Sequence, residues 1–201
     1  EMFEADAIRY ALAASFPEQS DTDLSVEEIA RRVNEELVAT WGNLVNRVLS
    51  MVHRTCGAEV PSADGRADGD LAVLAAVDTA IERVGGQIDR VELRAGIRTG
   101  IEAAAAVNAY LNATEPWKLA KSDPHRAGVV LGTALAAVAG VRVALSPYLP
   151  FSTAQLDGLF GELEGWVRVE PVPGTPVDKP TPMFAKVDLA ELLADEQGDE
   201  A

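Results

Sequence analysis

An amphipathic pattern dominates the N-terminal part of the sequence. Ser25 and Glu28 form a capping box, in which each side chain satisfies a backbone N–H group of the other. Apolar residues then recur at every third or fourth position up to Gly57, which favours a left-handed C-terminal cap: Ile29, Val33, Leu37, Trp41, Leu44, Val48 and Val52. At about 1.5 Å per residue, such a helix is roughly 45 Å long. We therefore expect the helix from Val26 to about Cys56 to be the central helix of a bundle.

The same periodicity predicts further helices. They span, in order, residues 3–16, 71–84, 88–111, 123–145 and 152–163. Gly85–Gly86 is expected to break the second of these from the third, and Pro116 to interrupt the chain after the third. Asp123 before Pro124 and a second capping box at Ser152–Gln155 are start signals for the last two. No stretch alternates like a strand, so residues 1–165 are expected to form an all-α bundle of about five to six helices.

Residues 166–201 have a different composition. Regular helix is excluded there by Pro171, Pro173, Pro176, Pro180 and Pro182, so we expect an extended, proline-rich C-terminal segment. Because proline lowers the entropy cost of ordering a chain, the segment is expected to fold back along the bundle, anchored by Met183 and Phe184. A short terminal helix over residues 187–193 and an acidic tail are expected to follow.

The charge and the cysteine count exclude several kinds of site. With 17 Lys and Arg against 32 Asp and Glu, the net charge is −15. A broad basic face that wraps duplex DNA is therefore excluded, and any nucleic-acid contact must be local. Cys56, His53 and His125 are too few and too scattered to form a structural zinc site. We expect no metal and no cofactor in this chain.

The N-terminal residues carry no signal sequence, and no uninterrupted apolar run reaches the ~18 residues that span a bilayer. We expect no membrane partner and a cytoplasmic location. A start at Glu1, within a predicted helix and without an initiator Met, is expected of a segment of a longer protein.

No pattern typical of a catalytic site is present in the sequence. His53 and His125 have no serine or cysteine partner at a recognisable spacing, and adjacent carboxylates such as Glu35 and Glu36 diverge on a helix. Cys56 falls at the C-terminal end of its helix, where the helix dipole does not activate a thiol. No catalytic residue is therefore assigned.

Two places favour contact with an unpaired base, and the first is the polar face of the long helix. Asn43 and Arg47 are one turn apart, so their side chains project side by side. The amide both donates and accepts hydrogen bonds, and the guanidinium is a planar fork of donors that bonds to or stacks on a base. Arg54 continues this stripe as a candidate phosphate contact. The alternative interpretation is an ordinary solvated helix face.

The second place is the corner at Pro116 and Trp117. A tryptophan on a rigid corner offers a stacking surface, and Lys118 and Lys121 add local positive charge and candidate phosphate contacts. The alternative interpretation is a hydrophobic plug between two helices. If both places serve one base, Trp117 must lie near Arg47 despite their separation in the sequence.

Several blocks of residues resemble, in order and spacing, the α-helical anticodon-binding region of methionyl-tRNA synthetases. The resemblance covers nearly the whole chain and rests on residues 6–12, 21–25, 32–37, Gly42-Asn43-Leu44-Val45-Asn46-Arg47, Leu111-Asn112 with Glu115-Pro116-Trp117-Lys118-Leu119-Ala120-Lys121, and 180–188. The first blocks are shared loosely with the leucyl, isoleucyl, valyl and cysteinyl class I enzymes. The Asn43–Arg47 pair, the proline–tryptophan turn and the closing segment together favour methionine.

The resemblance implies a tRNA anticodon-binding domain of a methionine–tRNA ligase. Residues matching Asn43, Arg47, Pro116 and Trp117 meet the CAU anticodon in the family, with the tryptophan stacked on its first base, cytosine. The implied partners are initiator and elongator tRNA(Met) and the catalytic domain of the same polypeptide. The HIGH and KMSKS signatures do not occur in these residues. ATP and the zinc of the family's insertion are therefore expected outside this chain, which should not adenylate methionine alone.

Two alternatives stay open. The same bundle could serve another class I synthetase, or a paralogue, with a different anticodon. A non-catalytic helical module that binds protein rather than RNA is favoured by the net charge of −15. The position of the basic residues separates this second alternative from a tRNA reader, which needs Arg47, Arg54, Lys118 and Lys121 on one surface.

Overall fold

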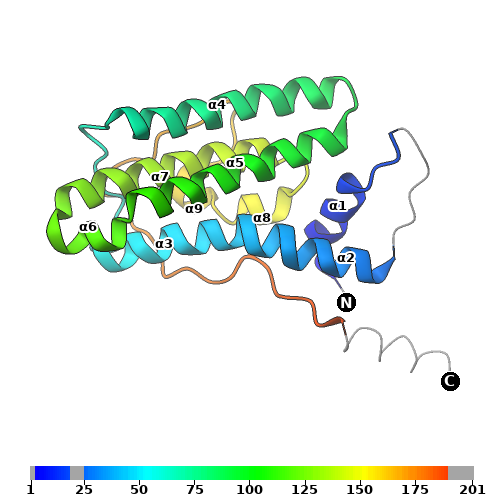
Figure 1. Ribbon diagram of the computed structural model, residues 1–201, viewed down its shortest axis with the longest axis horizontal. Helices are drawn as coiled ribbons and strands as arrows, with labels where there is room; N and C mark the ends of the chain where they lie inside the picture. Colours follow the sequence, from blue (N-terminus) through cyan, green and yellow to red (C-terminus); the bar gives the residue numbers. More distant parts are fainter. Residues whose placement is uncertain (1–2, 19–24, 190–201) are drawn as a thin grey trace.

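The described part of the protein is a helical bundle (Figure 1). The computed structural model describes residues 3–18 and 25–189. Their helices are α1 (Ala5–Ala14), α2 (Val26–Arg32), η1 (Val33–Gly42), α3 (Asn43–Thr55), α4 (Asp68–Asp89), α5 (Leu93–Thr114), α6 (Pro116–Ser122), α7 (Pro124–Leu145), α8 (Pro150–Ala154) and α9 (Asp157–Phe160). Within these residues the β-structure is an isolated bridge between Glu59 and Pro176. The all-α fold is confirmed.

The centre of the bundle is α7, rather than the long N-terminal helix. Helix α7 packs against α3, α4, α5, α6 and α8, and every residue from Val129 to Leu145 is buried. Among the described helices it alone has the length and mean hydropathy, 1.9 over 18 residues, to cross a membrane, but 94% of that window is buried inside the protein. It is therefore a core helix, and its uniform apolar surface reflects neighbours on all sides.

The predicted long helix exists but lies along one side of the bundle (Figure 1). Segments α2, η1 and α3 form one continuous helical stretch, because the junction residues Arg32 and Asn43 keep helical backbone angles. Its expected inward residues Val33, Leu37, Leu44 and Val48 are buried. Half of the predicted capping box is confirmed, since the Ser25 hydroxyl accepts the N–H of Glu28 at 3.2 Å. The Glu28 carboxylate instead pairs with Arg31 and Arg32. The π-helical form of η1 was not predicted.

The predicted break at Gly85–Gly86 is wrong, because α4 continues to Asp89. A Cβ on Gly85 would lie 2.7 Å from Nε1 of Trp166, and that N–H donates to the Ile81 carbonyl at 2.8 Å. The glycine therefore admits a tryptophan against the helix rather than ending it. The chain reverses instead at Val91, whose φ of 60° is in the left-handed region.

Of the two helix starts predicted after residue 120, one is confirmed and one is wrong. Asp123 caps α7 by accepting the N–H of Arg126 at 3.0 Å, which confirms that start signal. The predicted capping box at Ser152 is wrong, since Ser152 lies inside α8, whose first residue is Pro150. The segment to 163 is divided into two short helices, α8 and α9, rather than one.

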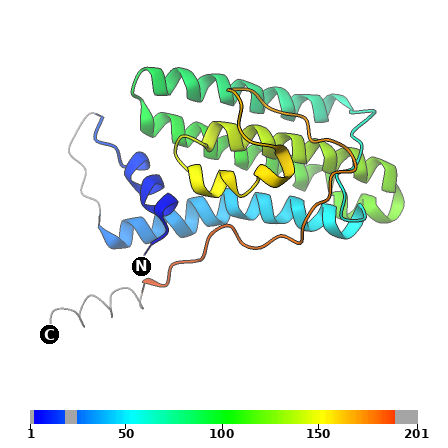
Figure 2. The ribbon, with the colours of Figure 1, turned by 180° about the vertical axis from the view of Figure 1, so that it is seen from behind.

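Residues 161–188 contain no regular helix and follow the outside of the bundle (Figure 2). Val60 exchanges backbone hydrogen bonds with the chain at Gly174 and Thr175, both at 2.9 Å. Met183 and Phe184 are buried. The backbone of Val187 is held by the Asn34 side-chain amide through two hydrogen bonds of 2.8 and 2.9 Å. The expected terminal helix and acidic tail lie largely outside the described residues, and the division of the chain at residue 165 stays a prediction.

Candidate nucleic-acid interface

Arg47 on α3 and Trp117 on α6 meet in space. The guanidinium carbon of Arg47 lies 5.0 Å from the centroid of the Trp117 ring, within the range of a cation–π contact. Trp117 is nevertheless 39% exposed, so it is not a buried plug. The predicted proximity of the two residues is therefore confirmed.

Asn112 on α5 holds the Arg47 side chain. Nη2 of Arg47 donates to Oδ1 of Asn112 at 2.6 Å. A guanidinium carries five N–H donors, so this bond fixes its plane and leaves capacity for other acceptors. Asn112 was not among the predicted site residues. Its role depends on a contact with a residue 65 positions away, which no local pattern encodes.

The corner that carries Trp117 is fixed by its backbone. Helix α5 ends at Thr114, the next residue Glu115 has left-handed angles of φ 46° and ψ 55°, and Pro116 is the first residue of α6. Proline suits the first helical position because its missing N–H has no partner there. Pro116 is also buried. The indole of Trp117 is thereby presented by a stiff turn rather than by a loose loop.

Asn43 lies one helical turn before Arg47 on α3, and Arg47 is partly buried. Asn43 is the first residue of α3, at the point where π-helix changes to α-helix, and its side chain is exposed. The preceding π-helical turn is tied to α5, because the side-chain amide of Asn108 donates to the Thr40 carbonyl at 3.2 Å. The face that presents Asn43 and Arg47 is thus fastened to the helix that carries Asn112.

The predicted phosphate contacts lie at one end of the molecule. Helix α6, with Lys118 and Lys121, and the C-terminal end of α3, with Arg54, occupy the same end of the bundle in both views (Figures 1 and 2). All three side chains are exposed. Lys118 pairs with Glu115 at 2.7 Å, which partly neutralises its charge. Arg54 donates to the Ser50 carbonyl at 3.1 Å.

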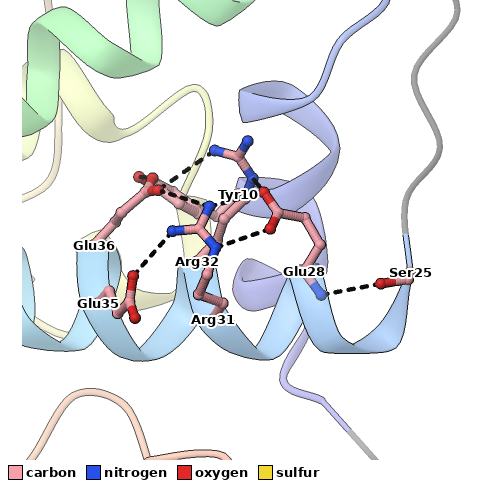
Figure 3. Close-up of polar contacts among 7 residues, drawn as sticks. All are labelled: Tyr10, Ser25, Glu28, Arg31, Arg32, Glu35 and Glu36. Atoms are coloured by element: carbon pink, nitrogen blue, oxygen red, sulfur yellow. Dashed lines mark hydrogen bonds and ion pairs between the residues drawn. The ribbon is translucent and has the colours of Figure 1, made fainter.

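A different polar cluster joins α1 to α2 and η1 (Figure 3). Arg31 bonds Glu28 and Glu35 at 2.8 and 2.9 Å, and Arg32 pairs with Glu28 at 2.8 Å. Tyr10 donates to Glu36 at 2.6 Å. Burial, together with the neighbouring Glu36 carboxylate, raises the pKa of Tyr10 far above its ordinary value. These arginines already have carboxylate partners, so the cluster fastens the helices together rather than offering free positive charge.

His53 and Cys56, two further side chains with catalytic chemistry, have structural surroundings instead of catalytic ones. His53 Nδ1 lies 3.1 Å from the Val177 carbonyl and so helps hold the C-terminal segment. Burial raises the pKa of the Cys56 thiol, which disfavours the reactive thiolate. Within residues 3–18 and 25–189, no three His, Cys, Asp or Glu side chains are grouped as a metal site.

Two family models match the sequence. Residues 60–193 match the anticodon binding domain of methionyl tRNA ligase, and residues 1–49 match the class I (M) tRNA synthetases. The chain belongs to the methionyl-tRNA ligase anticodon-binding family. The first match includes Trp117 and the second includes Asn43 and Arg47, so the site joins the two matched regions.

Similar proteins cover almost all of this anticodon-binding chain. The methionine–tRNA ligase of Kineococcus radiotolerans is 36% identical over 98% of the chain, and that of a Roseiflexus species is 37% identical over 98%. Each alignment takes in 38% of the relative, so the chain spans just over a third of the length of these relatives.

Solved structures agree with the fold of the anticodon-binding family. The free form of Mycobacterium tuberculosis methionyl-tRNA synthetase superposes with a TM-score of 0.86 and 29% identity, over 93% of this chain and 40% of that one. The form bound to methionyl-adenylate gives a TM-score of 0.83 and 29% identity, over 91% and 38%. The methionyl identity predicted from the sequence is confirmed at the level of the family.

Proposed function

We propose that this chain reads the CAU anticodon of tRNA(Met), initiator and elongator alike, for a methionine–tRNA ligase. This proposal rests on the contact between Arg47 and the partly exposed ring of Trp117. This contact places a stacking surface and a fork of hydrogen-bond donors within the width of one base. Single-stranded anticodon bases are recognised by this combination of stacking and edge contacts.

The first anticodon base, cytosine, stacks on Trp117. Such stacking contributes ~1–3 kcal/mol per base. Arg47 and Asn43 bond to base edges from the neighbouring α3 face, and Pro116 keeps the indole at its corner. Asn112 supports this arrangement because it already orients the Arg47 guanidinium in the free protein.

The phosphates of the anticodon loop bind the basic side chains of α3 and α6. Arg54, Lys118 and Lys121 are exposed at the end of the bundle that carries Trp117. These contacts are local, which suits a chain whose net charge of −15 repels a polyanion elsewhere.

The chemistry of methionine attachment belongs to the rest of the same polypeptide. The curated relatives are named methionine–tRNA ligases, and the chain spans 38% of their length. The part beyond this chain binds ATP and methionine, and zinc where that part has the family's insertion. This chain identifies the tRNA in the cytoplasm, with no membrane or DNA partner, and that other domain performs the reaction.

Kinetics of a complete ligase carrying this chain test the proposal. Trp117→Ala should lower kcat/KM for tRNA about tenfold or more, because one stacked base is lost. Methionine-dependent ATP–pyrophosphate exchange, which needs no anticodon, should stay unchanged. Phe151→Ala is the matched control, since Phe151 is an exposed aromatic on α8. An equal fall in exchange and aminoacylation with Trp117→Ala would make Trp117 structural and defeat the assignment.

A further inference from the structure

A buried carboxylate connects the three helices around the Trp117 corner. Asp70, in the first turn of α4, is 0% exposed. Arg126 donates to it through both terminal nitrogens, at 2.5 Å to Oδ2 and 2.8 Å to Oδ1. The Tyr110 hydroxyl donates to Oδ1 at 2.5 Å, and the backbone N–H of Ala67 donates to Oδ2 at 2.8 Å. The carboxylate therefore accepts four hydrogen bonds from four separate N–H and O–H groups.

Two of the Asp70 partners flank α6 along the chain. Tyr110 lies in the last turn of α5, and its carbonyl accepts the Thr114 hydroxyl at 2.8 Å. Arg126 lies in the first turn of α7, where its own N–H is capped by Asp123. Helix α6, which carries Trp117, is the short connection between these two helix ends. Asp70 thus bonds to residues on both of the helices, α5 and α7, that flank α6.

The Asp70 carboxylate is held in its charged form. Burial alone would raise its pKa, but hydrogen bonds from Arg126, Tyr110 and Ala67 outweigh this effect and the pKa is lowered. Loss of the charge would weaken the two-pronged bond from the part-buried Arg126 guanidinium, because one of the two carboxylate oxygens would no longer accept from it, so the link between Asp70 and the start of α7 would loosen. The start of α7 would then shift relative to the end of α5.

We propose that Asp70 is a positioning residue for base recognition: its carboxylate sets the spacing between the end of α5 and the start of α7, and so places Trp117 against Arg47. This inference rests on the proposed function for its effect on RNA, but the placement itself concerns the free protein. Asp70 touches no base. It acts through Tyr110 and Arg126 on the helix that carries the stacking ring.

Two variants and one control test this role in the 201-residue chain. Asp70→Asn removes the charge, and Tyr110→Phe removes only the hydroxyl that ties α5 to the carboxylate. Asp157→Asn is the control, because Asp157 pairs with the buried Arg142 farther along α7 and lies outside the corner. Tyr110→Phe decides the question if Asp70→Asn does not fold.

The first measurement is the ¹H–¹⁵N signal of the Trp117 indole, assigned by its loss in Trp117→Phe. This signal should move in Asp70→Asn and Tyr110→Phe and stay in place in Asp157→Asn. An unmoved signal in both variants, or an equal movement in the control, overturns the proposal. This measurement contains no RNA, so it is independent of the proposed function.

The second measurement is a double-mutant cycle on binding of an RNA hairpin with a CAU loop. Asp70→Asn should weaken binding about three- to tenfold in the parent chain and cause no further loss when combined with Trp117→Ala, because both changes act on one contact. Additive losses overturn the positioning role. If Trp117→Ala alone binds as tightly as the parent, the proposed function fails, and the indole signal still decides whether Asp70 places the ring.

Discussion

At the scale of single residues, Arg47 joins the two sides of the candidate site. Its side chain extends from α3, lies over the ring of Trp117 of α6 and donates a hydrogen bond to Asn112 of α5. A guanidinium can do all of this because it is planar and has five donors, whereas a lysine ammonium is a compact point charge. The geometry of the group, more than its charge, is therefore expected to determine binding.

Arg47→Lys tests this expectation because the charge is kept. Loss of the planar fork and of its stacking should weaken binding of a CAU hairpin by ~1–2 kcal/mol, about five- to thirtyfold. Titration calorimetry at fixed salt measures the change. Arg54→Lys is the control, since Arg54 is an exposed candidate phosphate contact and should lose little. Equal affinities for the parent and Arg47→Lys would assign Arg47 a purely electrostatic role.

The sequence predicts those site residues whose role can be recognised from their neighbours along the chain. Asn43 and Arg47 follow from one helical turn, and Trp117 from its place after a proline. Asn112 and Asp70 could not be found in this way, because their partners Arg47 and Arg126 lie 65 and 56 positions away. A side chain whose role is to hold another becomes visible only when the fold brings the two together.

At the scale of elements, the irregular parts of the helices lie where the site needs them. The π-helix η1 ends directly before Asn43. Residues after a π-helix are rotated about the axis relative to those of a continuous α-helix, so the faces of α2 and α3 are set separately. Within η1 the buried Val33, Leu37 and Trp41 recur at every fourth position. An α-helix also accommodates that spacing over a few turns, which is why the sequence predicts the long helix but not its π-helical middle.

Two glycines of α4 give opposite predictions for the same substitution. Gly69→Ala meets nothing within 4 Å and should stabilise the protein by up to about 1 kcal/mol, since alanine favours helix. Gly85→Ala places a Cβ 2.7 Å from the Trp166 nitrogen. Displacement of that ring should destabilise the protein by about 1–3 kcal/mol.

Urea unfolding of both glycine variants, followed by circular dichroism, measures these changes. Trp166 fluorescence should also respond in Gly85→Ala, because its hydrogen bond to the Ile81 carbonyl is broken. If Gly85→Ala were as stabilising as Gly69→Ala, the packing of Trp166 against α4 would not require a glycine at position 85.

At the scale of the whole molecule, recognition of RNA must overcome a net charge of −15. The polar cluster of Figure 3 shows how part of the charge is balanced, since its arginines pair with glutamates of the continuous stretch formed by α2 and η1. The basic groups at the α6 end of the bundle, Arg54, Lys118 and Lys121, are exposed. We therefore expect few phosphate contacts, whereas a protein-binding module would make none.

A salt titration of hairpin binding measures the number of phosphate contacts. The logarithm of affinity should fall with the logarithm of salt by about 0.7 per contact for a single strand. Lys121→Ala and Arg54→Ala should each lower this slope by about 0.7. Arg98→Ala, an exposed arginine of α5 paired with Glu102, is the control and should leave the slope unchanged. A flat salt dependence would favour the protein-binding module.

The sequence predicts the overall fold well because most elements carry their own signals. The caps at Ser25 and Asp123 are confirmed. What could not be predicted depends on tertiary neighbours. Helix α7 is the centre because other helices surround it, although the longer amphipathic pattern precedes it. Gly85 continues its helix because Trp166, distant in the sequence, packs on it.

Trp117 and its neighbours are proposed to read the first base of a CAU anticodon. The most direct test compares two RNA hairpins, one with a CAU loop and one with only the first base changed, for binding to the chain at low salt. Hydrogen bonds to a base edge discriminate by ~1–3 kcal/mol, so the CAU hairpin should bind about tenfold tighter or more. This preference should shrink in Trp117→Ala. Equal binding of both hairpins by the parent chain would contradict the account.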